Sequence, residues 1–495
     1  MLRAFAAAFA LAATPALADL TAEEVLADQL SLMDLFGLEV EIEGTSRSGD
    51  VLTVETLSSL IHFPEDDFAV LMSVQGISLT EQDDGSVVVT LPEETTMTLA
   101  ADDEGEDFSL DLALKQDGVK LTASGTPGQI LYELTGISIL LEGEHQDSDE
   151  DLFVDVNARL DMVDMLATMT VGMGTVRPYN FEAAAEMFQL AFDGYLNSFS
   201  LDGGYRFNDV RATYSGKLAK RSAKDSYVQG IAKGNAKTGS ITHGESTYGI
   251  GTNAGTYGFD LDLGISTAGG SYFIAEDTSG ARYNGTYKDV KATAEFGRNI
   301  GFPKMEFSLA EASAQLQIPL VPGDDPQDIA LSATLTDLEI DPALWSMFDP
   351  EKLLPRVPAS LVVDASGEVI LTEDISTPEF AEKSVTELPG QINNLKIDEF
   401  LLSLAGTELT GDGDLTFDNQ SGFPMPIGVA NLALTGGETL IDTLVTLGLV
   451  PEQQAAFARM MTGMMGRTGD DPDTLVSAIE MKEDGSILAN GQRIR

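Results

Sequence analysis

Residues 107–123 read DFSLDLALKQDGVKLTA, and this stretch decides the fold class. Its apolar residues fall on every second position, which is the period of a β-strand with one buried face. The alternating positions are Phe108, Leu110, Leu112 and Leu114. The pair Asp117-Gly118 then supplies the residue types of a tight turn, and the alternation begins again after it. The stretch therefore predicts an antiparallel β-hairpin.

The same pattern recurs along most of the chain. Alternating segments stand near residues 137–141, 305–309 and 331–340, and turn-forming residues separate such segments. Turns at this spacing predict a long antiparallel meander with one apolar and one acidic face. We therefore expect a mainly β protein, whose curved sheet or sheets are closed by a few short amphipathic helices.

The helices are expected at the N-terminus, near the middle and at the C-terminus. Thr21 to Glu24 is a capping sequence for the first helix, and Asp341-Pro342 starts a short helix around the only tryptophan, Trp345. Asp349-Pro350 is a second such pair. Separately, a stripe of Met, Phe, Tyr and Leu at helical spacing between residues 181 and 199 predicts a middle helix. The middle helix is expected at Phe181–Phe199, and the C-terminal ones at Leu440–Leu447, from Pro451 and at Pro472–Ile479.

Composition limits the classes of partner. The 495 residues include 80 acidic and 28 basic side chains, for a formal charge of −52. A surface this negative repels phosphate backbones, so nucleic acid is excluded as a partner. The chain has no cysteine, so disulfides contribute nothing, but 43% of its residues are hydrophobic and can build a large core.

The first residues have the pattern of an export signal. Arg3 precedes an apolar run, Ala4–Ala13, and the small residues Ala16 and Ala18 fit a cleavage site. We expect cleavage after Ala18 and a periplasmic mature chain. The run breaks at Thr14-Pro15, short of the roughly 20 residues that a transmembrane helix needs, and no later segment is long enough. No transmembrane helix is expected in the mature chain.

We expect three regions after the signal at 1–18: a β-rich lobe at 19–199, a Gly- and Tyr-rich β region at 200–302, and a C-terminal β lobe at 303–495. Positions 201–300 hold 8 of the 11 tyrosines and 17 of the 48 glycines, and 12 basic residues nearly balance 10 acidic ones. FNDVRAT at 207–213 recurs as YKDVKAT at 287–293. The echo predicts two equivalent strands of one sheet that point Arg211 and Lys291 to the same face.

Motifs that carry chemistry are missing. His62, His145 and His243 lie far apart without the spacing of metal ligands, and residues 147–151 begin like a calcium loop but lack its glycine and final glutamate. We expect no enzyme activity, cofactor, metal site or catalytic residue. The one candidate binding feature is a pair of methionine doublets on one helix face. Met460, Met461, Met464 and Met465 could form a lid or wall of an apolar groove, or fill the core beneath their helix.

The C-terminal third resembles a known family. Leu344-Trp345, the strand at 411–415, the run Leu447-Gly448-Leu449-Val450-Pro451 and the closing DGSILANG at 484–491 carry the likeness. They resemble an exported alphaproteobacterial family of unknown function, domain of unknown function 2125. The resemblance implies an envelope location and a long β-rich fold, with no catalytic residue to transfer. Long meanders closed by short helices are also loosely similar to AsmA-type envelope proteins, whose curved sheets are suspected of handling lipid.

Two classes of function follow from these observations. One is a non-enzymatic envelope protein whose curved sheet holds a lipid or an apolar partner on its concave face. The other is a structural or assembly protein of the envelope with a fully packed sheet. An outer-membrane β-barrel is a third, weaker alternative, because the aromatic girdles of such barrels are missing outside the middle region.

The leader gives the first testable prediction. Replacing Ala18 by a bulky residue such as Phe should block processing, because the cleavage site takes small side chains. N-terminal sequencing of the exported chain should give Asp19 as its first residue, and Ala13→Phe should be processed normally as a control. A mature start more than two residues from Asp19 contradicts the prediction.

Overall fold

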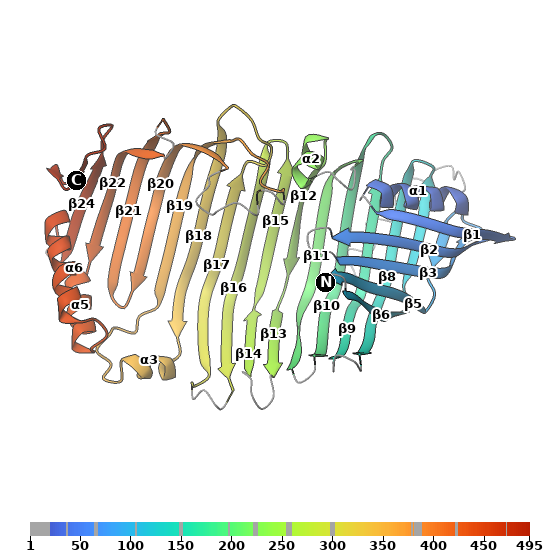
Figure 1. Ribbon diagram of the computed structural model, residues 1–495, viewed down its shortest axis with the longest axis horizontal. Helices are drawn as coiled ribbons and strands as arrows, with labels where there is room; N and C mark the ends of the chain where they lie inside the picture. Colours follow the sequence, from blue (N-terminus) through green and yellow to red (C-terminus); the bar gives the residue numbers. More distant parts are fainter. Residues whose placement is uncertain are drawn as a thin grey trace, which may run out of the picture.

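The computed structural model describes residues 20–35, 38–63, 68–103, 106–147, 152–196, 199–220, 226–253, 260–297, 302–377, 380, 389–420, 424–471 and 473–495. These residues form one antiparallel sheet of 26 strands with five helices against it or at its end (Figure 1). The expectation of a mainly β fold with a long antiparallel sheet is confirmed.

The N-terminal part of the sheet contains ten strands. They are β1 (Glu39–Ser48), β2 (Val51–Phe63), β3 (Phe68–Glu81), β4 (Val87–Thr90), β5 (Glu94–Asp103), β6 (Glu106–Asp117), β7 (Lys120–Thr126), β8 (Gln129–Asp147), β9 (Leu152–Val171) and β10 (Val176–Leu196). The central strands are β11 (Phe199–Ala219), β12 (Ala236–His243), β13 (Ser246–Asn253), β14 (Leu261–Thr267), β15 (Gly269–Asp277), β16 (Gly280–Phe296), β17 (Met305–Ile318) and β18 (Gln327–Ile340).

The C-terminal strands are β19 (Ala359–Leu371), β20 (Gly390–Leu404), β21 (Thr407–Asp418), β22 (Met425–Thr435), β23 (Arg467–Thr468), β24 (Thr474–Met481), β25 (Ile487–Ala489) and β26 (Gln492–Arg493). The helices are α1 (Ala22–Leu35), α2 (Tyr227–Ala232), α3 (Pro342–Phe348), α5 (Gly437–Thr446) and α6 (Glu452–Met465).

Most strands pair with their neighbour in sequence, but the meander forks twice. β3 pairs with both β4 and β5. β4 pairs next with β7, β5 pairs next with β6, and both β6 and β7 pair with β8. In the same way, β11 pairs with both β12 and β13. β12 pairs next with β15, β13 pairs next with β14, and both β14 and β15 pair with β16. The same connection order is therefore used twice in one sheet.

The forks lie on a line of left-handed residues that crosses the sheet. Positive φ angles occur at Gly76 (78°), Gly136 (64°), Asp164 (49°), Asp209 (51°), Asp289 (48°) and Asp337 (54°). Regular pairing is interrupted there, as between Thr135 and Ile137 of β8 and between Leu335 and Leu338 of β18. Such β-bulges bend a strand and increase its twist. Because they are aligned, the bends add up to one crease across the sheet.

Each bulge also shifts the alternation of side chains by one residue. The concave-face residues of β11 run Phe207, Val210, Ala212, and those of β16 run Tyr287, Val290, Ala292, with one step of three in each strand. The extra residue on the other face is the left-handed aspartate. The sequence echo therefore marks the two strands that bound the second fork, and Arg211 and Lys291 lie on the same face, as predicted.

The expected middle helix at Phe181–Phe199 is wrong, because these residues belong to β10 and β11. The stripe that predicted it combines apolar residues from both faces of β10, because Phe188 and Phe192 lie on the concave face whereas Met187 and Ala191 lie on the other. Two adjacent apolar residues in every four imitate a helical period. The expected helix at Pro472–Ile479 is also wrong, since β24 covers Thr474–Met481 and pairs with β22. The helices expected from Thr21, around Trp345, near Leu440 and after Pro451 are confirmed as α1, α3, α5 and α6.

The sheet runs without a break across the boundaries expected at residues 200 and 303. β11 begins at Phe199 and pairs with β10 over its whole length, and β16 pairs with β17 in the same way. The expected regions thus differ in composition within one continuous sheet.

α1 is held against the N-terminal strands by an apolar core and a buried ion pair. Val25 packs with Val54, Leu79 and Tyr132. The Arg177 guanidinium donates to Asp28 at 2.6 Å, and the Tyr132 hydroxyl donates to the other oxygen of Asp28 at 2.6 Å. Removing one partner of such a buried pair leaves a charge without compensation, so this contact fixes the position of α1.

The bulge line gives a prediction on stability. Asp209→Val should lower the free energy of unfolding by about 1–2 kcal/mol, because a β-branched residue is strained at φ 51°. Asp209→Gly, which accepts this conformation, should cost clearly less. Asp202→Val, in a regular part of the same strand, should be neutral or stabilising. The free energies come from urea titrations followed by circular dichroism, and equal values for the Val and Gly variants at 209 would argue against the strain.

Candidate apolar binding face

The two faces of the sheet have opposite chemistry. In an antiparallel sheet, directly opposed residues share a face, so register traces a row of side chains across the strands. One such row crosses nine strands and is entirely apolar or aromatic: Ile139, Leu160, Leu190, Tyr205, Tyr248, Ile265, Ala292, Phe307 and Ile340. The adjacent row is entirely polar: Ser138, Asp161, Gln189, Arg206, Thr247, Ser266, Lys291, Ser308 and Glu339.

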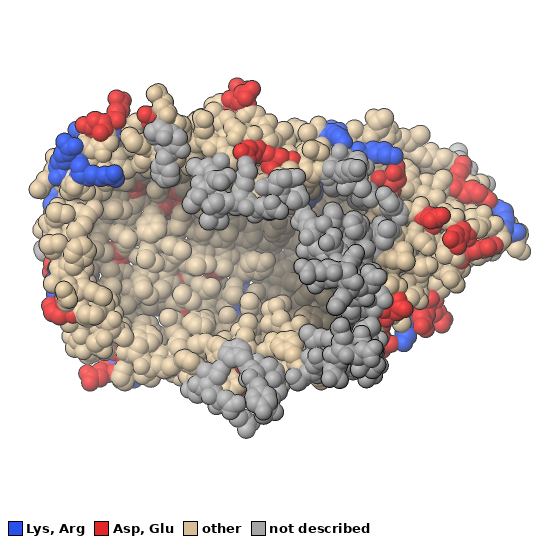
Figure 2. Space-filling view, viewed as in Figure 1, with Lys and Arg blue, Asp and Glu red and all other residues tan. Residues whose placement is uncertain are grey.

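The apolar face is the hollowed one. Figure 2 shows a trough lined mainly by uncharged residues, with most acidic and basic side chains at its rim and ends. α1 lies on this side and packs on Ile130 and Tyr132, which belong to the same face. The concave face is therefore apolar and the other face polar along these rows, and the polar row holds two acidic and two basic side chains, so the expected acidic character of that face stays a prediction.

The widest apolar part of the trough lies over the C-terminal strands. A hollow of about 600 Å³ between β17 and β22 has an almost wholly apolar lining. Opposed residues build it strand by strand, and its lining includes Leu316, Leu331, Val363, Ile397, Phe400 and Leu432. Gly411 lies between Phe400 and Leu432 in register, and because it has no side chain the hollow is deeper at this point. The hollow offers shape and apolar surface and almost no polar contact.

A second apolar hollow lies under α1. Its volume is about 370 Å³, and Leu26, Leu30 and Met33 of α1 cover it while Leu79 and Leu134 of the strands line it. The helix thus closes the N-terminal end of the same face from above.

The middle of the trough is aromatic. The ring of Phe188 stacks on Tyr205 with centroids 5.9 Å apart, and Phe207 meets His243 edge-on at 4.9 Å. His243 in turn lies 6.1 Å from the ring of Tyr287. These contacts bring the Tyr-rich region of the sequence onto the same face as the aliphatic C-terminal hollow.

A polar cluster at the rim of this region holds α2. The buried Glu276 carboxylate accepts from Lys237 at 2.8 Å, from Tyr283 at 2.7 Å and from Tyr227 of α2. Burial alone would raise the pKa of Glu276, but these hydrogen bonds outweigh it and lower the pKa below its ordinary value of 4.5. α2 is also tied to the segment after β19, since Ser226 donates to Asp374 at 2.6 Å. The cluster fixes α2 over the edge of the trough.

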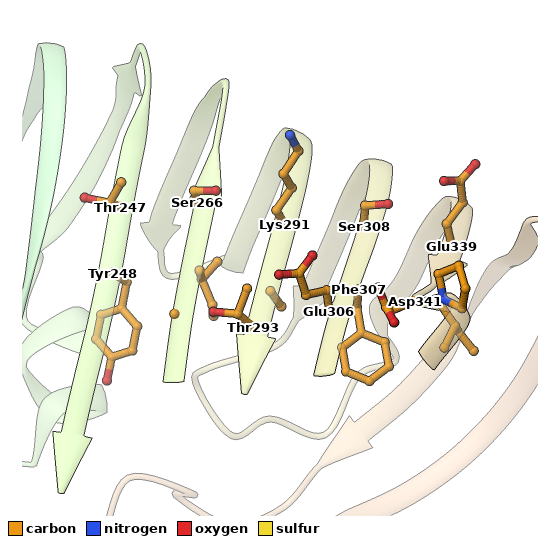
Figure 3. A pocket seen from close by; sticks show the side chains of 15 residues that line it. Thr247, Tyr248, Ser266, Lys291, Thr293, Glu306, Phe307, Ser308, Glu339 and Asp341 are labelled. Carbon is orange, nitrogen blue, oxygen red and sulfur yellow. The ribbon is translucent and has the colours of Figure 1, made fainter. Parts of the chain in front are cut away.

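A third hollow, of similar size to the C-terminal one, lies across β13, β14, β16, β17 and β18. It has a volume of about 600 Å³, and its lining is mixed: Thr247, Ser266, Lys291 and Ser308 of the polar row contribute to it, and so do Tyr248, Ile265, Phe307 and Ile340 of the apolar row. Figure 3 shows these side chains on neighbouring strands, with the rings of Tyr248 and Phe307 pointing another way. Within the described residues, no group of three or more His, Cys, Asp or Glu side chains is arranged to hold a metal ion.

The four predicted methionines all lie on α6, but they divide into two pairs. Met460 and Met464 are exposed, whereas Met461 and Met465 are half-buried. None of the four lines the 600 Å³ apolar hollow. Their role as a lid stays a prediction, and Ala16 and Ala18 of the expected cleavage site lie outside the described residues. The Glu276 cluster and the Asp28–Arg177 pair were missed, because their members stand up to 149 positions apart without a motif.

Together these features define a class: an open, single-sheet antiparallel β protein with one apolar, hollowed face. Residues 286–485, from β16 to the turn after β24, match the family model DUF2125, described as an uncharacterized protein conserved in bacteria. This match confirms the resemblance seen in the sequence, while the looser similarity to AsmA-type proteins stays a prediction. No curated protein and no solved structure matches the chain.

Among the described residues, no helix combines the length and apolar character needed to cross a membrane.

The Glu276 cluster gives a prediction with a defined pH dependence. Glu276→Gln should lower the free energy of unfolding by about 2 kcal/mol at neutral pH, because a buried carboxylate loses its ion pair with Lys237. A lowered pKa stabilises the fold above the unfolded value of 4.5, and this contribution disappears as the pH falls through the folded value.

The difference between wild type and Glu276→Gln should therefore shrink in acid, as measured by urea titrations at a series of pH values. Glu306→Gln removes an exposed pair with Lys304 and should change the free energy by less than about 0.5 kcal/mol. A difference that grows in acid would contradict the proposed role of the charge.

Proposed function

We propose that this chain is a non-enzymatic, exported envelope protein that holds an acyl chain or a similar apolar ligand on the concave face of its sheet. The observation that carries the proposal is the C-terminal hollow on the concave face, where large apolar side chains are left partly open to solvent. Leu316, Leu331 and Leu432 of this hollow are 38%, 47% and 39% exposed.

A sheet that served only as a packed scaffold would cover such a surface. Contiguous apolar patches on soluble proteins usually mark a binding surface, because each exposed Å² costs free energy that a ligand recovers by covering it. The N-terminal end of the same face is covered by α1, whereas no described helix covers the hollow between β17 and β22. This contrast favours a ligand over the C-terminal strands.

The chemistry of the lining selects the class of ligand. Leu, Ile, Val and Phe dominate the hollow between β17 and β22, and polar groups contribute almost nothing to it. A ligand with many hydrogen-bonding groups would lose its contacts with water there and gain none. A methylene chain has no hydrogen bonds with water to lose, and each buried CH₂ contributes about 0.8 kcal/mol to the free energy of binding.

The dimensions of the trough fit an extended chain. Six steps between neighbouring strands separate β16 from β22, which at about 4.8 Å per step gives a path of about 29 Å along the face. The path is open along one side, so a long chain can enter sideways without threading through a closed cavity. An export signal and an envelope family support placing this activity outside the cytoplasm.

The test uses a fluorescent fatty acid and delipidated full-length mature protein. Wild type should bind the probe with saturation, and unlabelled oleate should displace it. Leu331→Gln should weaken binding at least tenfold, because it puts an amide on the floor of the hollow. Ser332→Gln is the matched control, since this neighbouring residue of β18 points to the polar face and should leave affinity unchanged.

Failure of wild type to bind the probe, with no lipid released from protein purified from its own envelope, would contradict the proposal. It would favour the structural or assembly role instead.

A further inference from the structure

A group of tyrosines lies on the concave face beside the apolar hollow between β17 and β22. We call it the tyrosine cluster, and its members are Tyr179 of β10, Tyr214 of β11, Tyr227 of α2, Tyr272 of β15 and Tyr283 of β16. Tyr283 is directly opposite Leu316, which lines the hollow, so the cluster begins one strand away from it. Tyr214 belongs to the same row as Tyr283, through Gly239 and Ile274.

Three hydroxyls of the tyrosine cluster lack a partner in the described part of the chain. The hydroxyls on α2 and β16 donate to Glu276, as described above. Tyr179, Tyr214 and Tyr272 make no hydrogen bond to another described residue, although Tyr179 and Tyr214 are half-buried. A tyrosine hydroxyl usually has a hydrogen-bond partner when its ring is covered, so these three are available to a polar group of a ligand.

The same hydroxyls lie close enough to act on one another. Burial raises the pKa of Tyr214, and the nearby Tyr272 hydroxyl adds to the shift. Burial likewise raises the pKa of Tyr179, with Tyr214 adding to the shift against the opposing charge of Lys237. Both phenols therefore stay uncharged at neutral pH, where each can donate one hydrogen bond and accept another.

A strip of small residues connects the tyrosine cluster to the hollow. The row of Tyr272 leads to Val363, which lines the hollow, through Gly285, Ala314 and Ala333. Apart from the chain neighbours of Gly285, no described atom lies within 4 Å of the point where a side chain would begin at this residue. A molecule in the hollow can therefore extend over Gly285 to the tyrosine hydroxyls while it stays on the sheet.

The concave face offers no free charge to an ionic group. Among the described residues of β11–β22, register places only Lys237 and Glu276 as charged side chains on this face, and they are paired with each other. A phosphate or carboxylate head would meet no unpaired cation there, in a chain whose formal charge is −52. An uncharged head with hydroxyl and ester groups suits the phenols, because it also donates and accepts hydrogen bonds.

We propose that the tyrosine cluster binds the uncharged, hydroxyl-bearing head of a monoacylglycerol-type lipid, whose acyl chain lies in the hollow between β17 and β22. This inference rests on the proposed function, because it takes the acyl chain in the hollow as given. It adds the orientation of the ligand, with its head toward β11 and its chain toward β22. It also adds a preference for a neutral head over a carboxylate.

The test compares 1-monooleoylglycerol with oleate, which has the same acyl chain and a charged head. Each lipid displaces the fluorescent fatty acid from delipidated full-length mature protein at neutral pH, below the concentration at which it aggregates. Wild type should bind 1-monooleoylglycerol at least about tenfold more tightly than oleate. The double variant Tyr214→Phe with Tyr272→Phe keeps the rings and removes two hydroxyls, so it should lose most of this preference while its affinity for oleate stays unchanged.

Matched control variants come from the opposite face. Tyr195→Phe should keep the wild-type preference, since register places this exposed tyrosine of β10 on the other side of the sheet. Gly285→Leu fills the connection between the hollow and the tyrosine cluster and should abolish the preference. Asn284→Leu adds a similar side chain at the neighbouring residue on the other face and should keep the preference.

The outcomes separate this inference from the proposed function. Equal affinity of wild type for the two lipids, or a preference that survives in the Tyr214 and Tyr272 double variant, overturns this inference and leaves the proposed function standing. Binding of neither lipid by wild type overturns both. Leu331→Gln should weaken both lipids to a similar degree, because it acts on the acyl chain. If the double variant loses both lipids through a folding defect, the preference measured for Gly285→Leu decides.

Discussion

The continuity of one apolar face depends on a row of left-handed residues. A strand that simply alternates keeps its apolar residues on one side only while it stays regular, and a bulge would move all later residues to the other side. Here left-handed residues recur at the same level in five strands, at Gly136 of β8, Asp164 of β9, Asp209 of β11, Asp289 of β16 and Asp337 of β18. Each strand shifts its apolar spacing from two to three at that level. The sheet is therefore creased while its concave face stays apolar on both sides of the crease, and the hollow over the C-terminal strands depends on this.

The sequence predicts the class of fold because alternation is a local signal. Residues 107–123 contain β6, the Asp117-Gly118 turn and the start of β7, and the capping sequences at Thr21 and Asp341 predict α1 and α3. Alternation is hidden where both faces of a strand carry apolar residues. In β10 adjacent apolar residues such as Met187 and Phe188 lie on opposite faces and imitate a helix, and only the pairing with β9 and β11 shows that the segment is a strand. The forks are likewise set by long-range pairing, which no local pattern contains.

The candidate site could be predicted only in outline. One-faced alternation predicts that an apolar face exists, but the pattern is the same whether that face is packed or open, so the open hollow between β17 and β22 required the arrangement of strands and helices. The methionine doublets directed attention to α6 correctly, yet helix periodicity alone does not say which residue of each doublet faces the sheet. Met461 and Met465 face inward because Ala455 and the contacts of Met465 with β24 orient the helix.

The two forks also set the order in which a growing chain can build the sheet. In the simple meander, each new strand finds its partner already present, so assembly can follow the chain from the N-terminus with short loops to close. At β11 the growing sheet divides: β12 and β13 leave two separate edges, and β16, which begins 81 residues after the start of β11, is the first strand to pair along both branches. The C-terminal half can therefore be added to the sheet only after β16 has joined the two branches, because β17 pairs with β16.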